Sequence, residues 1–177
     1  MNKTTITLTT LAAIALASCQ SKDDDSATTE PKEASPELMA VIDAKVDAEP
    51  SDIHVIRKTA KPGDTITVTG WVMGNMNPFV EGRAAFILGD PKVVTACNVR
   101  PDDHCSTPWD VCCDDPADIK RATASIQIVD ADGRVLKEGI EGVEGIEKLS
   151  KLLVTGTVAE GSSEDSLVIN ASAIDLQ

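Results

Sequence analysis

Alternating apolar and polar residues predict five β-strands from residue 64 onward. The alternation is plainest in DTITVTGWV (residues 64–72) and ATASIQIVD (residues 122–130). Three further runs are rich in the β-branched and apolar residues that strands favour: AAFILGD (84–90), KLLVTGTV (151–158) and SLVINASAI (166–174). The sequence DADG (130–133) predicts a hairpin turn that leads into residues 134–139.

Two of these strands carry a glycine directly after a threonine near their middle, Gly70 in VTGWV and Gly156 in VTGTV. A glycine inside a strand lets a small barrel turn a corner. Five strands in this order, two of them with such a bend, resemble an OB-fold. We therefore expect a mainly β fold, a small five-stranded OB-fold-like barrel with a Cys-rich insertion, and an unspecified β-sandwich or barrel is the alternative. Residues 143–150 occupy the position of the OB helix but carry too little apolar surface for a long one.

The first eighteen residues have the outline of a secretory signal peptide. Lys3 supplies a single positive charge, and the run from Ile6 to Ala17 contains no charged residue. This run is too short to cross a bilayer, which needs about 17–25 apolar residues. The sequence therefore predicts export without a transmembrane helix.

The tetrapeptide LASC at residues 16–19 resembles the lipobox of bacterial lipoproteins. The resemblance implies that Cys19 receives a diacylglycerol thioether, becomes the mature N-terminus and is then acylated, for example with palmitate. An ordinary signal peptide cut near Ala17 or Ser18 is the alternative. Gln20 stands where an aspartate would suggest retention at the inner membrane. The implied location is the cell envelope, with the outer membrane facing the periplasm as the preferred surface.

Composition divides the rest of the chain into a tether and one domain. Residues 20–36 contain no large apolar residue, so they cannot bury enough surface to offset the entropy of ordering. We interpret residues 19–50 as a flexible acidic tether with a short helix at residues 36–46, whose apolar residues have roughly helical spacing. Residues 51–177 then form the barrel domain, with a Cys-rich loop at residues 97–118.

The chain is strongly acidic, with 29 Asp and Glu residues against 16 Lys and Arg residues and a net charge of −13. Nucleic-acid affinity comes largely from cationic side chains that displace counterions. The chain also has only two Trp, two Phe and no Tyr for stacking on bases. We therefore expect no nucleic-acid partner, but a membrane contact through the lipid and an envelope protein as the partner.

A resemblance over most of residues 63–175 rests on PFVEGRAAFIL, CSTPWDVCC, ATASIQIVDADGRVL and KLLVTGTV. With these segments the chain resembles bacterial lipoproteins of planctomycete type, which carry an OB-like domain with an inserted Cys-rich loop. The resemblance implies an architecture and no activity. KTAKPGDTITVTGWV is more distantly similar to the opening strand of small periplasmic OB proteins linked with stress or cation binding. Those proteins lack the cysteine insertion, so none of their functional residues is transferred.

Four cysteines lie close together between the second and third predicted strands: Cys97, Cys105, Cys112 and Cys113. The preferred interpretation is two disulfides, because an exported chain meets an oxidising compartment and the number is even once Cys19 is set aside. A bond between the neighbours Cys112 and Cys113 would be strained. We therefore expect each of them to pair with Cys97 or Cys105.

The alternative is a metal site in the same loop. Thiolates with His104 nearby match the soft ligands of Zn²⁺ or Cu⁺. The spacing lacks the C-x₂-C pairs that make zinc motifs specific, and no C-x-x-C supports a redox-active pair.

Nothing in the spacing of polar residues predicts an enzyme. No Ser-His-Asp or Cys-His arrangement and no phosphate loop can be read from the sequence. We expect His54 to be a surface or packing residue and Trp109 to pack on the cysteine loop. The expected function is a lipid-anchored, non-catalytic binding or structural module of the envelope that needs no cofactor, and the alternative is a periplasmic lipoprotein that binds Zn or Cu.

Overall fold

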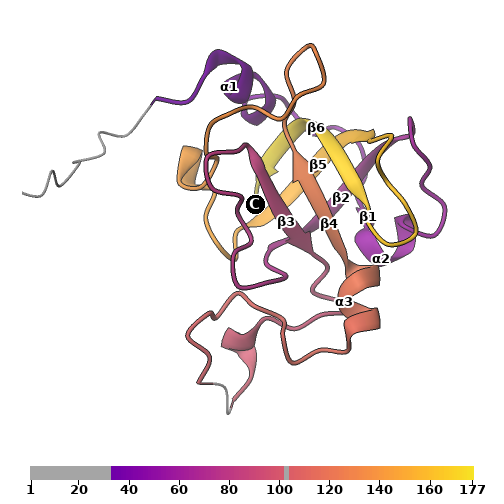
Figure 1. Cartoon of the computed structure of the whole chain (residues 1–177), viewed down its shortest axis with the longest axis vertical. Helices are drawn as coiled ribbons and strands as arrows, with labels where there is room; N and C mark the ends of the chain where they lie inside the picture. Colours follow the sequence, from indigo (N-terminus) through magenta and orange to yellow (C-terminus); the bar gives the residue numbers. More distant parts are fainter. Residues whose placement is uncertain (1–32, 102–103) are drawn as a thin grey trace, which may run out of the picture. The chain divides into compact units, whose positions relative to one another are not determined.

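The predicted strands close into a small barrel. The computed structural model describes residues 33–101 and 104–177. Five strands of this part form the barrel: β2 (Thr65–Val72), β3 (Ala85–Gly89), β4 (Thr123–Gln127), β5 (Lys151–Val158) and β6 (Val168–Leu176). They follow the order β2-β3-β4-β6-β5, and β5 pairs again with β2 (Figure 1). The pair β4–β6 is parallel and the other barrel pairs are antiparallel. The predicted OB-fold-like barrel is thus confirmed.

The short strand β1 (Ser51–Asp52) lies outside the barrel and pairs in parallel with β2. The strand predicted at residues 122–130 is shorter at both ends: helix α3 (Pro116–Ala122) includes its first residue, and the strand stops at Gln127. Asp115 caps this helix by accepting a hydrogen bond from Ala117 N at 2.8 Å, and Pro116 fills the first helical turn. The segment predicted to follow the DADG turn pairs through one bridge, between Val129 and Val135.

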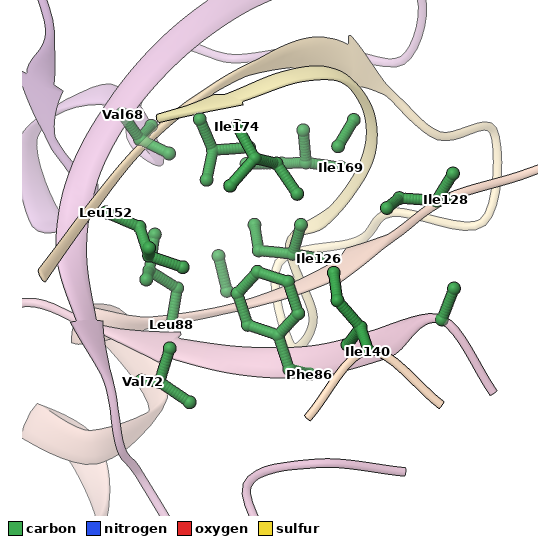
Figure 2. Packing of buried hydrophobic residues seen from close by; sticks show 14 of the residues in the cluster. Val68, Val72, Phe86, Leu88, Ile126, Ile128, Ile140, Leu152, Ile169 and Ile174 are labelled. Carbon is green, nitrogen blue, oxygen red and sulfur yellow. The ribbon is translucent and has the colours of Figure 1, made fainter. Parts of the chain in front are cut away.

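The main core fills the inside of the barrel. Side chains from all five strands meet there, with the Phe86 ring near the centre and Ile126, Leu152, Ile169 and Ile174 around it (Figure 2). Each of these side chains is at most 1% exposed. The ring of Phe79, in the β2–β3 loop, packs on Phe86 with 5.9 Å between centroids. Burial of this alternating set of apolar residues explains why the period-2 pattern predicted the strands correctly.

Gly70 and Gly156 lie where the barrel strands approach each other most closely. A Cβ atom on Gly156 would lie 2.3 Å from the Asn170 carbonyl oxygen, and one on Gly70 would lie 2.7 Å from the Gly89 carbonyl oxygen. The register between β5 and β6 shifts at Thr155 and Gly156. Such an irregularity bends a strand and increases its twist. The two glycines thus permit this close approach, and the register shift at Gly156 agrees with the bend that the mid-strand pattern predicted.

Helix α1 (Pro36–Ile42) packs on the barrel rather than extending from it. Leu38 is completely buried in the main core, and Ser35 accepts a hydrogen bond from Leu38 N at 3.2 Å. Ser35 N in turn donates to the Glu138 carboxylate at 3.0 Å. The compact unit therefore begins at Glu33, and not at residue 51 as the tether interpretation placed it. The predicted signal peptide (1–18), Cys19 and the tether up to residue 32 lie outside the described residues.

Three short helical segments complete the described part of the chain. They are α2 (Ile53–Ile56) and two 3₁₀ turns, η1 (Cys97–Val99) and η2 (Val143–Gly145). Only the η2 turn stands in the position of the OB helix, as the scarcity of apolar residues in 143–150 predicted. None of the described helices has the length and apolar character to cross a membrane.

The DADG turn is closed by one carboxylate. Asp130 Oδ1 accepts hydrogen bonds from the N–H groups of Arg134 and Asp132, both at 2.9 Å. The bond from the Arg134 N–H is the main reason why the pKa of Asp130 lies below its usual value. Bonds of this kind favour the ionised carboxylate.

We therefore expect Asp130→Asn to lower the melting temperature at pH 7, and the difference from the wild type to shrink below about pH 4. A carboxyl group with a lowered pKa in the folded state contributes stability above its unfolded pKa. That contribution is lost as the pH falls through the folded pKa. Thermal unfolding followed by circular dichroism between pH 7 and pH 3 measures the difference. Asp47→Asn removes an exposed carboxylate elsewhere and serves as the control. An equal difference at both ends of the pH range would contradict this role of the Asp130 charge.

Candidate metal centre in the cysteine-rich loop

The cysteines lie on the long connection between β3 and β4, which is drawn below the barrel strands in Figure 1. A second, smaller apolar core lies under this connection, shared with Met73 just after β2. Its buried residues are Met73, Val94, Ala96, Val111 and Ala122, and partly buried Trp71, Val93, Trp109, Ile119 and Leu149 pack around them. The members of this cluster are scattered along the sequence and show no strand or helix period, so it could not be predicted. The cluster explains how such a long connection is ordered.

Backbone hydrogen bonds hold the two arms of the loop side by side. Cys97 N donates to the Asp110 carbonyl and Asn98 N donates to the Pro108 carbonyl, both at 2.9 Å. Thr95 N donates to the Asp114 carboxylate at 2.7 Å. As a result, residues separated by more than ten positions in the chain come together at Cys97.

Three of the four cysteines in the loop form one cluster. The Sγ atoms of Cys97, Cys105 and Cys112 all lie within 4.8 Å of one another. The Sγ atoms of Cys97 and Cys112 are 4.0 Å apart. Cys97 is buried, Cys105 is half-buried and Cys112 is exposed. The cluster thus has one protected side and one side open to solvent.

Cys113 lies at the edge of this cluster. Its Sγ atom is 4.0 Å from that of Cys112, and its side chain is exposed. A disulfide bond has a length of about 2.05 Å. The two Sγ–Sγ distances of 4.0 Å are about twice as long, so neither Cys97–Cys112 nor Cys112–Cys113 is bonded in this structure.

The structure does not bring His104 into the sulfur cluster. His104 is exposed, and its ring nitrogens are not among the atoms within 4.8 Å of one another. The neighbouring residues 102 and 103 lie outside the described residues. The described aspartates have structural partners: Asp114 pairs with Arg100, and Asp110 Oδ1 accepts from Val111 N.

The environment of Cys112 favours its protonated form. Its hydrogen bond with Cys97 lowers the pKa, but the bond with Cys113, partial desolvation and the negative charge of Asp110 raise it, and the net effect is a raised pKa. A thiol of this kind is a weak nucleophile at neutral pH. It becomes a thiolate when a metal ion displaces the proton.

A second polar pair lies at the other end of this connection. His54 Nδ1 is 2.7 Å from Asp90 Oδ2, and Asp90 is 1% exposed. Asp90 also accepts hydrogen bonds from the backbone N–H groups of His54 and Lys92. The pair fastens α2 to the end of β3. We predicted His54 to be a surface or packing residue, and it is half-buried and packs against Asp90. Nothing in the spacing of the sequence indicated Asp90 as its partner.

A hollow beside Trp109 was not indicated by the sequence either, because its lining combines the cysteine loop with residues 141–149 of the β4–β5 connection.

Comparison of the chain with protein-family models, curated proteins and solved structures gave no match.

Proposed function

We propose that this protein is a lipid-anchored module of the cell envelope that binds one soft metal ion, Zn²⁺ or Cu⁺, through Cys97, Cys105 and Cys112. The mutual proximity of the three Sγ atoms, all within 4.8 Å, is the observation that supports it.

The sulfur spacing is close to that of thiolates on a shared ion. Two sulfur ligands at about 2.3 Å from Zn²⁺ and at a tetrahedral angle are about 3.8 Å apart. The Sγ atoms of Cys97 and Cys112 are 4.0 Å apart. Small adjustments of the side chains would therefore place three thiolates around one ion. Soft thiolate ligands select Cu⁺ and Zn²⁺ over hard cations such as Mg²⁺ or Ca²⁺.

The difference in burial among the three cysteines favours exchange of the ion over permanent storage. Cys97 is 1% exposed and is fixed by the loop core, whereas Cys112 faces solvent. A ligand on the open side can detach first and leave the ion accessible to another molecule. Cys113, whose Sγ atom is 4.0 Å from that of Cys112, is suitably placed to take part in that exchange.

The lipid anchor completes the proposal. The resemblance of LASC to a lipobox supports acylation of Cys19, and two or three acyl chains hold a protein firmly, since each buried CH₂ contributes about 0.8 kcal/mol. The envelope location, with the outer membrane preferred, follows from the same resemblance. The barrel then serves as a rigid support for the loop, and we assign no catalysis to it.

A disulfide-stapled loop in a binding or structural module is the second candidate. The closeness of Cys112 to both Cys97 and Cys105 favours it, because a rotation of side chains would allow a bond in an oxidising compartment. In that case Cys113 is expected to pair with the remaining cysteine of the first two. The two candidates predict different thiol counts and different metal contents.

The decisive experiment measures both quantities on the full chain purified without reductant. We expect one bound Zn²⁺ or Cu⁺ by native mass spectrometry, a Cys113 thiol that reacts with the metal in place, and three further thiols that react only after the metal is removed. Cys97→Ser, Cys105→Ser and Cys112→Ser are each expected to weaken metal binding at least about tenfold, since each removes one ligand. Cys113→Ser is the matched control and is expected to keep the affinity within about threefold, a small free-energy change.

Two results would overturn the metal proposal. A chain without metal and without titratable thiols would establish the stapled loop instead. Equal loss of metal in all four serine variants would show that the three clustered cysteines are not a distinct ligand set.

A further inference from the structure

A groove on the barrel surface adjoins the cysteine loop. It consists of two hollows, of about 530 Å³ and about 410 Å³, which share Glu141 and Lys148 as lining residues. The first lies against the β2–β3 loop at Phe79 and Val80, and the second reaches Trp109 in the cysteine loop. Each hollow is within the range of ligand-binding pockets, about 300–1,000 Å³.

The centre of the groove already holds a positive charge. The Lys148 ammonium lies 4.8 Å from the centroid of the Trp109 ring and forms an ion pair with Glu141. Trp109 Nε1 donates to the Met76 carbonyl at 2.8 Å, which fixes the orientation of the ring. An aromatic face with a carboxylate beside it is a recognised arrangement for cation binding. Lys148 thus shows that the position between Trp109 and Glu141 accommodates a cation.

Apolar surface lies next to this cation position. Phe79 lines the first hollow, and Ile140 beneath it is 1% exposed. Val80 and Met76 border the same region and are exposed by 49% and 59%. A ligand that fills the groove therefore brings an apolar group as well as a charge.

The charges on the lining complement a cation and repel an anion. Glu81, Glu141 and Glu147 line the two hollows, and Lys148 is the one basic residue among the described lining. The chain as a whole carries a net charge of −13. Its field attracts positively charged molecules over several ångströms beyond the contact itself.

We propose that this groove docks a basic, partly apolar peptide segment of a partner protein. An arginine or lysine of that segment takes the position between Trp109 and Glu141, and Lys148 turns outward to solvent. Lys148 occupies this position in the free protein and so competes with the partner. The proposal stands on the groove alone and does not require a metal ion in the loop.

The test uses the full chain and a seven-residue peptide of serine, leucine and arginine with blocked ends. Binding is followed by fluorescence anisotropy of a label on the peptide, and amide chemical shifts locate it. We expect saturable binding that shifts resonances within residues 77–82 and 139–149. The matched peptide with glutamate in place of arginine is expected to show no binding.

Variants separate recognition from general charge attraction. Glu141→Gln is expected to weaken binding about threefold and Trp109→Leu about tenfold, because each removes one side of the cation position. Lys148→Ala is expected to strengthen binding about threefold, because it removes the competitor and its repulsion. Glu160→Gln removes one exposed charge from the β5–β6 loop, outside both hollows, and is expected to leave binding unchanged.

Several outcomes would overturn the proposal. Weaker binding of the arginine peptide to Lys148→Ala would show that Lys148 supports binding and does not compete with the ligand. Equal binding of spermidine and of the peptide would show a site for small cations. Self-association of the chain through the groove, detected by sedimentation, would identify a second copy as the occupant. Because Trp109→Leu can disturb the loop fold, the opposite shifts in Glu141→Gln and Lys148→Ala decide the test.

Discussion

Gly156→Ala is expected to destabilise the barrel by about 3 kcal/mol, which corresponds to a fall of about 10 °C in melting temperature for a domain of this size. The added Cβ would lie 2.3 Å from the Asn170 carbonyl oxygen and 2.9 Å from the Ala171 Cα. Both contacts are with the backbone of β6, which cannot rotate away as a flexible side chain can. The strands must separate at the register shift instead, and this breaks the pairing that closes the barrel. Thermal and urea unfolding of the full chain measure the effect.

Gly161→Ala provides the matched control for this substitution. A Cβ at Gly161 meets no atom within 4 Å. The same change is therefore expected to be neutral or to stabilise the protein by about 0.4–1 kcal/mol, since alanine restricts the unfolded chain. Equal melting temperatures for the two variants would refute the idea that close strand approach at Gly156 shapes the barrel.

Cys19→Ser is expected to abolish fatty acylation of the protein completely. A serine hydroxyl cannot form the thioether that the lipobox resemblance implies for residue 19. Growth with an alkynyl palmitate, followed by coupling of a dye to the purified chain, measures incorporation. Intact mass of the wild type is expected to correspond to a chain that begins at Cys19 and carries acyl groups. Without them the module would lose the membrane affinity that the acyl chains contribute.

Cys113→Ser is the control for this experiment, because it makes the same change at an exposed cysteine of the loop. Its acylation is expected to match that of the wild type. A labelled Cys19→Ser protein, or a wild-type mass without lipid, would remove the basis for the envelope location.

The strands could be predicted because their residues alternate between a buried, apolar face and an exposed, polar face. In β4 and β5 the residues alternate between the barrel core and the surface, so the period of two is visible in the sequence. The prediction for β5 has the same bounds as the strand itself, Lys151–Val158. Helix α1 was predicted at residues 36–46, but it ends at Ile42. Leu38 is its one fully buried residue, and Val41 and Ile42 pack on the core while partly exposed. So short an apolar pattern could not distinguish a packed helix from part of a tether.

The candidate site could be predicted only in part. The clustering of cysteines in the sequence indicated a common site, and three of them do lie together. The sequence could not show which three of the four cysteines lie together. Their positions depend on backbone hydrogen bonds that join distant parts of the loop, such as that from Cys97 N to the Asp110 carbonyl. His104 precedes Cys105 directly but lies outside the cluster, so proximity in sequence was misleading there. The groove at Lys148 gave no local signal at all, since its lining combines three loops.

The loop that carries the cysteines packs in an apolar cluster separate from the one inside the barrel, and this cluster includes Met73, which directly follows β2. A segment whose core is largely separate can open and close as a unit while the strands around it remain paired, so its amides are expected to exchange with solvent before those of β5. A loop of another length could be transplanted between Gly89 and Thr123 at a modest entropic cost. It would have to bring apolar side chains of its own, because Met73 is completely buried in this cluster.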